Sequence, residues 1–178
     1  NGGIFTSLDR EGNIYGREKS VWFQGRALWV FSKAYNVIEK NKDYLDAAKN
    51  IYEFLEKCTD TDGRMYFTVT RDGQPLRKRR YWFSETFYII ANAEYYMATK
   101  DKDYLERAVK YFNFVYKMYK DPSADPFKIT PKSYAQTRNM KALANPMIML
   151  NVTSIMRQAD EQNFAYYNDI ITKLIEDI

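Results

Sequence analysis

An internal repeat of about 60 residues is the feature that most constrains the fold of this chain. The segment Asn41-Lys42-Asp43-Tyr44-Leu45 returns as Asp101-Lys102-Asp103-Tyr104-Leu105, and the pair Trp22-Phe23 returns as Trp82-Phe83. Both matches are shifted by 60 positions, a number that follows directly from the residue numbers. Self-similarity at a fixed period is typical of repeated supersecondary units that stack on one another.

A turn sequence recurs as well, because Asp9-Arg10-Glu11-Gly12 resembles Thr70-Arg71-Asp72-Gly73 with a shift of 61. A third copy of the unit is present but weaker. The chain is 178 residues long, which is the length of a single domain. We therefore predict one domain over residues 1–178, built from units at about 1–60, 61–120 and 121–178.

Each unit contains helical patterns of two kinds. In residues 43–57 the apolar positions form one stripe, at Tyr44, Ala48, Ile51, Tyr52 and Leu55. This spacing predicts an amphipathic helix with one solvated face. The counterpart that begins at Tyr104 keeps the same register, and Asp43 and Asp103 are the residues we expect to cap the two helices.

The segment 22–38 differs because its apolar residues leave no broad polar face. A helix that is apolar on all sides is expected to be buried on all sides. Residues 83–97 show the same pattern, and residues 147–156 are a third candidate. We expect these three helices to begin near Trp22, Phe83 and Asn145, with their N-terminal ends on one rim.

Alternating buried and amphipathic helices predict an inner and an outer layer that curve into an arc. Residues 4–8 and 65–69 read as hairpin strands that turn at Glu11-Gly12 and Asp72-Gly73. The proline-rich residues 121–132 read as a loop. The expected fold class is therefore all-α, with three inner/outer helix pairs and short β-hairpin-like connections. Three helix pairs cannot close a ring, so we expect these residues to be part of a longer chain.

Composition excludes several functions. Lys and Arg total 27 and Asp and Glu total 23, so the net charge is +4, which is too small to indicate a nucleic-acid partner. No apolar stretch is long enough to predict a membrane helix. The single Cys58 and the absence of His exclude disulfide frameworks and the commonest metal ligands, so we predict no metal site and a cytoplasmic location.

The run Arg77-Lys78-Arg79-Arg80 is the densest charge cluster. It is followed by Tyr81 and Trp82, a combination that nucleic-acid-binding proteins also use. A solvated face next to a loop is the more common explanation of such a run. Neither of the glycine-rich phosphate-binding motifs occurs, so we expect no cofactor.

Four segments, taken in order along the chain, resemble motifs of the N-acylglucosamine 2-epimerase family. They are Gly2-Gly3-Ile4-Phe5-Thr6-Ser7-Leu8-Asp9-Arg10-Glu11-Gly12, Trp22-Phe23-Gln24-Gly25-Arg26-Ala27-Leu28-Trp29-Val30-Phe31-Ser32, Arg79-Arg80-Tyr81-Trp82-Phe83-Ser84-Glu85 and Asn145-Pro146-Met147-Ile148-Met149-Leu150-Asn151. The resemblance implies an incomplete (α/α)6 toroid. It also implies an isomerase that interconverts N-acylglucosamine and N-acylmannosamine, or a related aldose, by moving a proton at C2.

That chemistry uses two groups with pKa values near neutrality, and the family uses two histidines on later helices. Because this chain has no His, the resemblance implies that the chain alone is inactive. The expected partner is a small sugar. Since some family members respond to ATP and dimers are common among them, the resemblance leaves a nucleotide effector and a homodimer open.

The resemblance assigns Arg26 to the sugar pocket, where it would stabilise the enolate-like oxygen electrostatically. It assigns Trp22, Phe83, Glu85 and Asn145 to substrate binding. Each has a structural alternative: Arg26 and Glu85 could pair on adjacent inner helices, Phe83 could be ordinary core, and Asn145 could cap the helix that Pro146 begins.

Two other classes stay open. A glycoside hydrolase with the same toroid would need two carboxylates beside the pocket, and Glu85 is the inner-helix acid placed for that. A non-catalytic helical-repeat binding module would suit the lack of His. Polar, well-capped terminal helices would favour the module, whereas bare apolar ends would favour an incomplete toroid.

Overall fold

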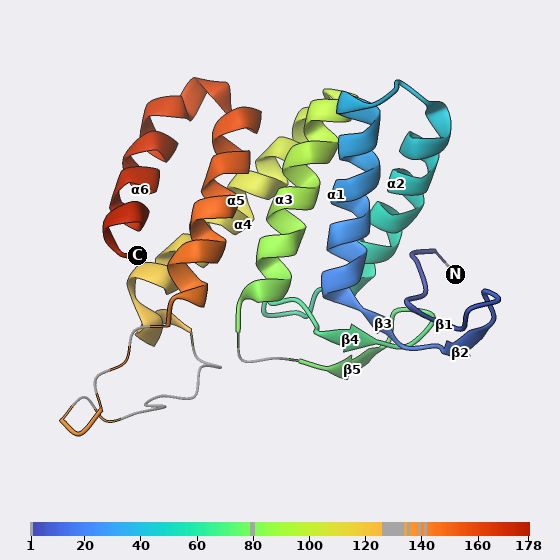
Figure 1. Ribbon diagram of the computed structural model, residues 1–178, viewed down its shortest axis with the longest axis horizontal. Helices are drawn as coiled ribbons and strands as arrows, with labels where there is room; N and C mark the ends of the chain where they lie inside the picture. Colours follow the sequence, from blue (N-terminus) through green and yellow to red (C-terminus); the bar gives the residue numbers. More distant parts are fainter. Residues whose placement is uncertain (1, 79–80, 126–133, 135, 139, 141) are drawn as a thin grey trace.

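The computed structural model describes residues 2–78, 81–125, 134, 136–138, 140 and 142–178. Over these residues it has six α-helices, which follow one another in three pairs (Figure 1). Their bounds are α1 Val21–Val37, α2 Lys42–Leu55, α3 Phe83–Thr99, α4 Lys102–Lys120, α5 Ala144–Ala159 and α6 Phe164–Glu176. Helices α1, α3 and α5 lie side by side, and each packs against the helix that follows it. The predicted all-α fold, an incomplete toroid of inner/outer pairs, is confirmed.

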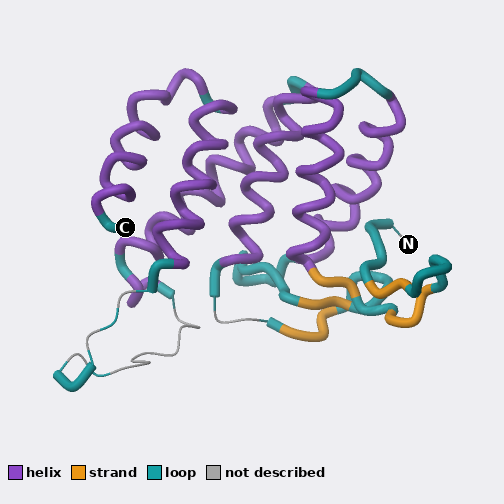
Figure 2. Tube along the Cα trace, viewed as in Figure 1, coloured by secondary structure: helices purple, strands orange, loops and turns teal. Residues whose placement is uncertain are grey.

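Short antiparallel strands lie at the end where the inner helices begin (Figure 2). Strand β1 Ser7–Leu8 pairs with β2 Ile14–Gly16. Strands β3 Lys19–Ser20, β4 Thr68–Val69 and β5 Pro75–Arg77 form a second sheet in that order. Both predicted hairpins are therefore present, and the β3–β4 pairing adds a direct link between the first and second units.

The third connection begins with a 3₁₀ turn at Pro122–Ala124, in keeping with the proline-rich loop predicted there. Most of the remaining predicted loop lies outside the described residues. None of the helices in the described ranges is long and apolar enough to cross a membrane.

The caps of the outer helices differ from the prediction. Asn41 caps α2, because its Oδ1 accepts a hydrogen bond from the backbone N–H of Asp43 at 2.8 Å. Asp101 caps α4 in the same way, accepting from the N–H of Asp103 at 3.1 Å. Asp43 and Asp103 lie inside the first turn, where their negative charges interact favourably with the helix dipole.

Helix α3 is more deeply buried than the other two inner helices. Residues 84–95 of α3 are buried except for the half-buried Phe87, as the sequence predicted for an inner helix. The same prediction is wrong for α1, where Phe23, Val30 and Val37 are 46%, 50% and 64% exposed, and for Met147 of α5, which is 54% exposed. Helix α3 is covered because it packs between α1 and α5, whereas the main helix contacts of α1 are with α3 and α2.

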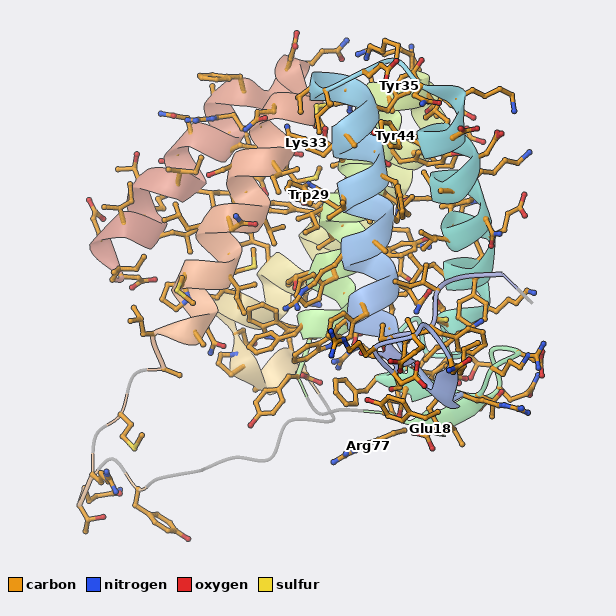
Figure 3. The ribbon with its side chains drawn as sticks, turned by 45° about the vertical axis from the view of Figure 1, so that its right-hand side comes forward. Glu18, Trp29, Lys33, Tyr35, Tyr44 and Arg77 are labelled. Atoms are coloured by element: carbon orange, nitrogen blue, oxygen red, sulfur yellow. The ribbon has the colours of Figure 1, made fainter. Side chains whose placement is uncertain are left out.

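Far from the strands, α1 and α3 are joined by a polar contact. Trp29 and Lys33 project from α1 on the side of α3 (Figure 3). The Lys33 ammonium lies 3.4 Å from the buried carboxylate of Glu94, and Asn36 donates to the same carboxylate at 2.8 Å. Trp29 packs between the two hydrophobic clusters of the core, one centred on α3–α6 and the other on α1–α3.

Contacts of the first unit recur in the second at a shift of 61. The N–H of Gly12 donates to the Asp9 carbonyl, and the N–H of Gly73 donates to the Thr70 carbonyl, both at 3.1 Å. The buried residues of α1 fall on buried positions with the same shift: Val21, Gln24, Gly25, Leu28 and Ser32 match Trp82, Glu85, Thr86, Ile89 and Ala93. Trp22 therefore corresponds to Phe83 in space, although the sequence match with Trp82 suggested a shift of 60.

We expect Gly25→Ala to destabilise the protein, although alanine in a helix interior normally adds up to about 1 kcal/mol relative to glycine. A Cβ at Gly25 would lie 2.7 Å from the Cβ of Phe87 and 3.0 Å from its carbonyl carbon and oxygen, so α1 and α3 must separate. The expected loss is about 1–3 kcal/mol in the free energy of unfolding. Urea unfolding measures it, with Asn113→Ala at an exposed position of α4 as the control. A stabilised Gly25→Ala variant would contradict the close approach.

Candidate functional site

The three inner helices begin at one end of the molecule. Val21, Phe83 and Ala144 start α1, α3 and α5, and all three helices begin at the lower end of the view (Figure 1). This arrangement confirms the prediction of a shared rim. Side chains of the first turns of α1 and α3 can therefore contribute to one surface.

An aromatic cluster covers the first turns of α1 and α3. The half-buried Trp22 ring lies 5.0 Å from Phe67, 5.8 Å from Phe83 and 5.7 Å from Phe87, measured between ring centroids. The indole N–H of Trp22 donates to the hydroxyl of Ser84 at 2.9 Å. Trp22 and Phe83, both predicted to line the pocket, are thus brought into contact.

Arg26 lies beside this cluster and is exposed. Its guanidinium carbon is 4.6 Å from the centroid of the Phe87 ring and 5.5 Å from that of Phe23. In the part of the chain that the structure describes, no carboxylate forms an ion pair with Arg26. The guanidinium is held by stacking on aromatic faces, which leaves its N–H donors available to a ligand.

Glu85 occupies a different environment. It is fully buried in the first turn of α3, where its Oε1 accepts hydrogen bonds from the Nε of Arg64 at 2.7 Å and from the backbone N–H of Met65 at 2.9 Å. The structural alternative, in which Arg26 pairs with Glu85, is therefore wrong. It failed because Arg26 corresponds in space to Phe87, and that face of α1 is exposed. This geometry does not support substrate binding by Glu85, since its carboxylate is not accessible to solvent.

Arg64 joins two buried carboxylates. Its Nη1 donates to the Oδ1 of Asp125 at 2.6 Å, and all three side chains are at most 3% exposed. Burial raises the pKa of Glu85, and the Arg64 guanidinium opposes that effect. Sequence reasoning missed Arg64 and Asp125. The signal that could have found them is the repeat itself, because Arg64 and Asp125 are 61 positions apart, as are Gln24 and Glu85.

Asn145 lies apart from the aromatic cluster. It is half-buried in the first turn of α5 and lines a groove of about 860 Å³ together with residues of α4, α5 and the C-terminal end. Neither Trp22, Arg26 nor Phe83 lines this groove. The capping role, the structural alternative for Asn145, is wrong, because α5 already begins at Ala144 and its N-cap position is Leu143, with no side-chain cap.

A metal centre has no basis in the described ranges, which contain no group of three or more His, Cys, Asp or Glu side chains that could hold an ion. Of the basic run predicted to be a solvated face, Arg77 is exposed, Lys78 forms ion pairs with Asp60 at 2.8 Å and Asp62 at 2.5 Å, and Arg79 and Arg80 lie outside the described residues.

Paired inner and outer helices with a polar and aromatic rim define an incomplete (α/α)6 toroid, the fold of several sugar-converting enzymes of known structure. The cellobiose 2-epimerase of Spirochaeta thermophila superposes with a TM-score of 0.78 at 24% identity, covering 98% of this chain and 46% of that one. A D-mannose isomerase superposes with a TM-score of 0.80 at 15% identity, over 99% of this chain and 45% of that one. These likenesses establish the fold.

The sequence establishes the family. Residues 3–177 match the model described as N-acylglucosamine 2-epimerase (GlcNAc 2-epimerase). The human N-acylglucosamine 2-epimerase is 33% identical over 175 residues, and the rat protein is 30% identical over 174 residues. The chain therefore belongs to the N-acylglucosamine 2-epimerase family. Each alignment covers 95% of this chain, which spans 40% of the length of the human relative and 41% of the rat one.

We expect Arg64→Met to lower stability in a pH-dependent way, because it leaves the buried Glu85 carboxylate without its counter-charge. Removing one partner of a buried pair typically costs about 3–5 kcal/mol. The folded-state pKa of Glu85 is raised above its unfolded value near 4.3. In the variant the Arg64 guanidinium no longer opposes the effect of burial, so the pKa of Glu85 rises further. The variant therefore loses stability relative to the wild type as the pH rises above the unfolded value, and the loss should be larger at pH 8 than at pH 5.

Urea unfolding of the wild type and of Arg64→Met at both pH values measures this difference. Lys173→Met is the matched control, since Lys173 and Asp169 form an exposed pair that contributes little to stability. Equal destabilisation by Arg64→Met at pH 5 and pH 8 would show that Glu85 is not the group left unpaired.

Proposed function

We propose that this chain forms one wall of the sugar pocket of a 2-epimerase that interconverts N-acylglucosamine and N-acylmannosamine, or a related aldose. The observation that carries the proposal is the position of Arg26. It is an exposed cation stacked on aromatic rings, without a carboxylate partner among the described residues, at the rim where the inner helices begin.

The reaction explains why a cation is useful there. Removing the proton from C2 of an open-chain aldose places negative charge on the neighbouring carbonyl oxygen. A guanidinium stays protonated at all physiological pH values and can donate two parallel hydrogen bonds to such an oxygen and its neighbour. Arg26 would stabilise the transition state more than the bound sugar, which is the requirement for catalysis.

The aromatic cluster supplies the binding surface. Rings such as Trp22 and Phe83 bury apolar area and present flat faces against which the C–H face of a sugar can pack. Removing the proton from C2 and returning it to the other face requires acid and base groups with pKa values near neutrality. No histidine occurs in the 178 residues, so these groups would come from another part of the protein, and this chain alone would be inactive.

The relatives support the choice of sugar. The rat and human relatives named N-acylglucosamine 2-epimerase align over 95% of this chain, whereas the Dictyoglomus turgidum relative named cellobiose 2-epimerase aligns over 58% of it at 30% identity. An N-acylated monosaccharide is therefore the substrate that we propose first. A nucleotide effector, a homodimer and a cytoplasmic location stay predictions.

The two alternative classes fare less well. An unsaturated glucuronyl hydrolase shares the fold, with a TM-score of 0.58 at 13% identity, but hydrolysis needs two carboxylates at the pocket. Glu85, the candidate for one of them, is fully buried against Arg64. A free-standing binding module would cap its terminal helices with polar residues. Helix α1 instead exposes Phe23, Val30 and Val37, spaced seven residues apart along one face.

Deuterium exchange at C2 tests the proposed reaction. We expect the full-length protein, incubated with N-acylglucosamine in D₂O, to form N-acylmannosamine and to place deuterium at C2 of both sugars. The isolated 178-residue chain should do neither. Cellobiose under the same conditions distinguishes a disaccharide epimerase, and release of a reducing sugar from a glycoside without C2 exchange would indicate a hydrolase instead.

We expect Arg26→Ala in the full-length protein to lower kcat on the order of a hundredfold, the typical effect of losing one donor to a developing oxyanion. Stability should change by no more than about 1 kcal/mol, since Arg26 is exposed and loses a stacking contact alone. Steady-state kinetics and thermal melting measure the two effects. Arg10→Ala, an exposed arginine of the β1–β2 turn, is the control. A normal kcat with a lowered melting temperature would remove Arg26 from the pocket.

A further inference from the structure

The ion triad of Arg64, Glu85 and Asp125 connects three separate segments. Arg64 lies in the turn before β4, Glu85 in the first turn of α3, and Asp125 directly after the 3₁₀ turn that follows α4. The Arg64 fork donates through Nε to Glu85 at 2.7 Å and through Nη1 to Asp125 at 2.6 Å. The planar guanidinium presents these two donors in a fixed fork, whereas the ammonium of a lysine has no fixed donor geometry.

The first unit of the repeat shows that the triad's charges are not needed to hold the preceding segment against an inner helix. Gln24 corresponds to Glu85 in the first turn of its inner helix, and its Oε1 accepts from the backbone N–H of Ile4 at 2.8 Å. Glu85 accepts from the backbone N–H of Met65 at 2.9 Å, and Met65 is 61 residues after Ile4. A neutral amide is thus sufficient to hold the preceding segment against an inner helix.

The charged triad of the second unit adds a link to the third unit. Asp125 follows Arg64 by 61 residues and occupies the corresponding place after α4. Through Arg64, the first turn of α3 is therefore fixed both to the turn before β4 and to the beginning of the next connection. In unit one, Gly3 stands at the position that corresponds to Arg64 and offers no side chain for such a link.

The first turn of α3 also carries part of the aromatic cluster. Ser84, next to Glu85, accepts the hydrogen bond from the indole of Trp22, and Phe83 lies 5.8 Å from the Trp22 ring. A displacement of this turn therefore moves Phe83 itself and shifts the acceptor that holds the Trp22 indole, and both residues are proposed to contact the sugar. Misplacement of binding groups by about 1 Å can cost two orders of magnitude in rate.

We infer that Arg64 is a positioning residue of the sugar pocket: by bridging Glu85 and Asp125 it fixes the first turn of α3, and with it Trp22 and Phe83, relative to the third unit. This inference rests on the proposed function for its kinetic consequence. Its structural consequence, the fixed environment of the Trp22 indole, does not depend on the reaction.

The test replaces all three charges at once. In the full-length protein, the triple variant Arg64→Met, Glu85→Gln, Asp125→Leu removes the three charges of the triad together and keeps an acceptor for the Met65 N–H, as Gln24 does in unit one. Exchanging buried ion partners for apolar residues of similar volume is often neutral for stability. We expect a melting temperature near that of the wild type and a loss of 10- to 100-fold in kcat/KM, with Lys173→Met as the unaffected control.

A purely stabilising role predicts the opposite outcome, in which kcat/KM recovers in the triple variant together with the melting temperature. That result would overturn the inference. If the triple variant melts early, its kcat/KM is measured at a lower temperature, where it is folded. Glu85→Gln alone, in which Arg64 stays bound to Asp125, is measured at the same temperature for comparison. Near-normal kcat/KM in the triple variant at that temperature would again overturn it.

The indole ¹H–¹⁵N resonance of Trp22 gives a readout that needs no substrate. We expect it to shift and to exchange faster with solvent in the triple variant, because its bond to Ser84 is no longer held in place. The indole N–H of Trp29 has no hydrogen-bond partner among the described residues and serves as the internal control. An unchanged Trp22 resonance would overturn the inference, whereas a shifted resonance in a protein that epimerises no sugar would contradict the proposed function instead.

Discussion

The packing of α3 between α1 and α5 is the constraint on which the rest of the structure depends. Gly25 allows α1 to approach the backbone of α3 at Phe87, and this contact sets the spacing of the inner layer. Because α3 is covered from both sides, residues 84–95 are buried apart from the half-buried Phe87, and every polar group among them requires a partner. The placement of charges follows from that requirement.

The two buried carboxylates of α3 are accordingly paired with a neighbouring helix or with a connecting segment. Glu94 is held by Lys33 and Asn36 of α1, and Glu85 by Arg64 of the preceding turn. The contacts at the two ends of α3 have different consequences. The Glu94 contact joins two neighbouring inner helices far from the strands, whereas the Glu85 contact lies at the rim and reaches the third unit through Asp125.

Periodicity predicted the helices, their pairing, both hairpins and the common rim, because these follow from local patterns of apolar residues and turns. It could not predict which side of α1 stays exposed, since exposure depends on neighbours rather than on the helix itself. The partner of Glu85 was missed for a related reason. Spacing along the chain favoured Arg26, but a difference of one residue in the repeat, 61 rather than 60, turns Arg26 away and leaves Arg64 facing the carboxylate. Asn41 and Asp101 likewise cap helices that we expected to begin two residues later.

The two arginines beside the rim illustrate how the same side chain takes opposite roles. Arg64 is buried, and its guanidinium donates to two carboxylates, so its charge is neutralised within the protein. Arg26 is exposed on the faces of Phe23 and Phe87, which hold its position without neutralising its charge. A guanidinium held in this way keeps both its charge and its donors for an anionic oxygen. Burial and partners, rather than residue type, therefore separate the arginine that builds the rim from the one that we propose to act at it.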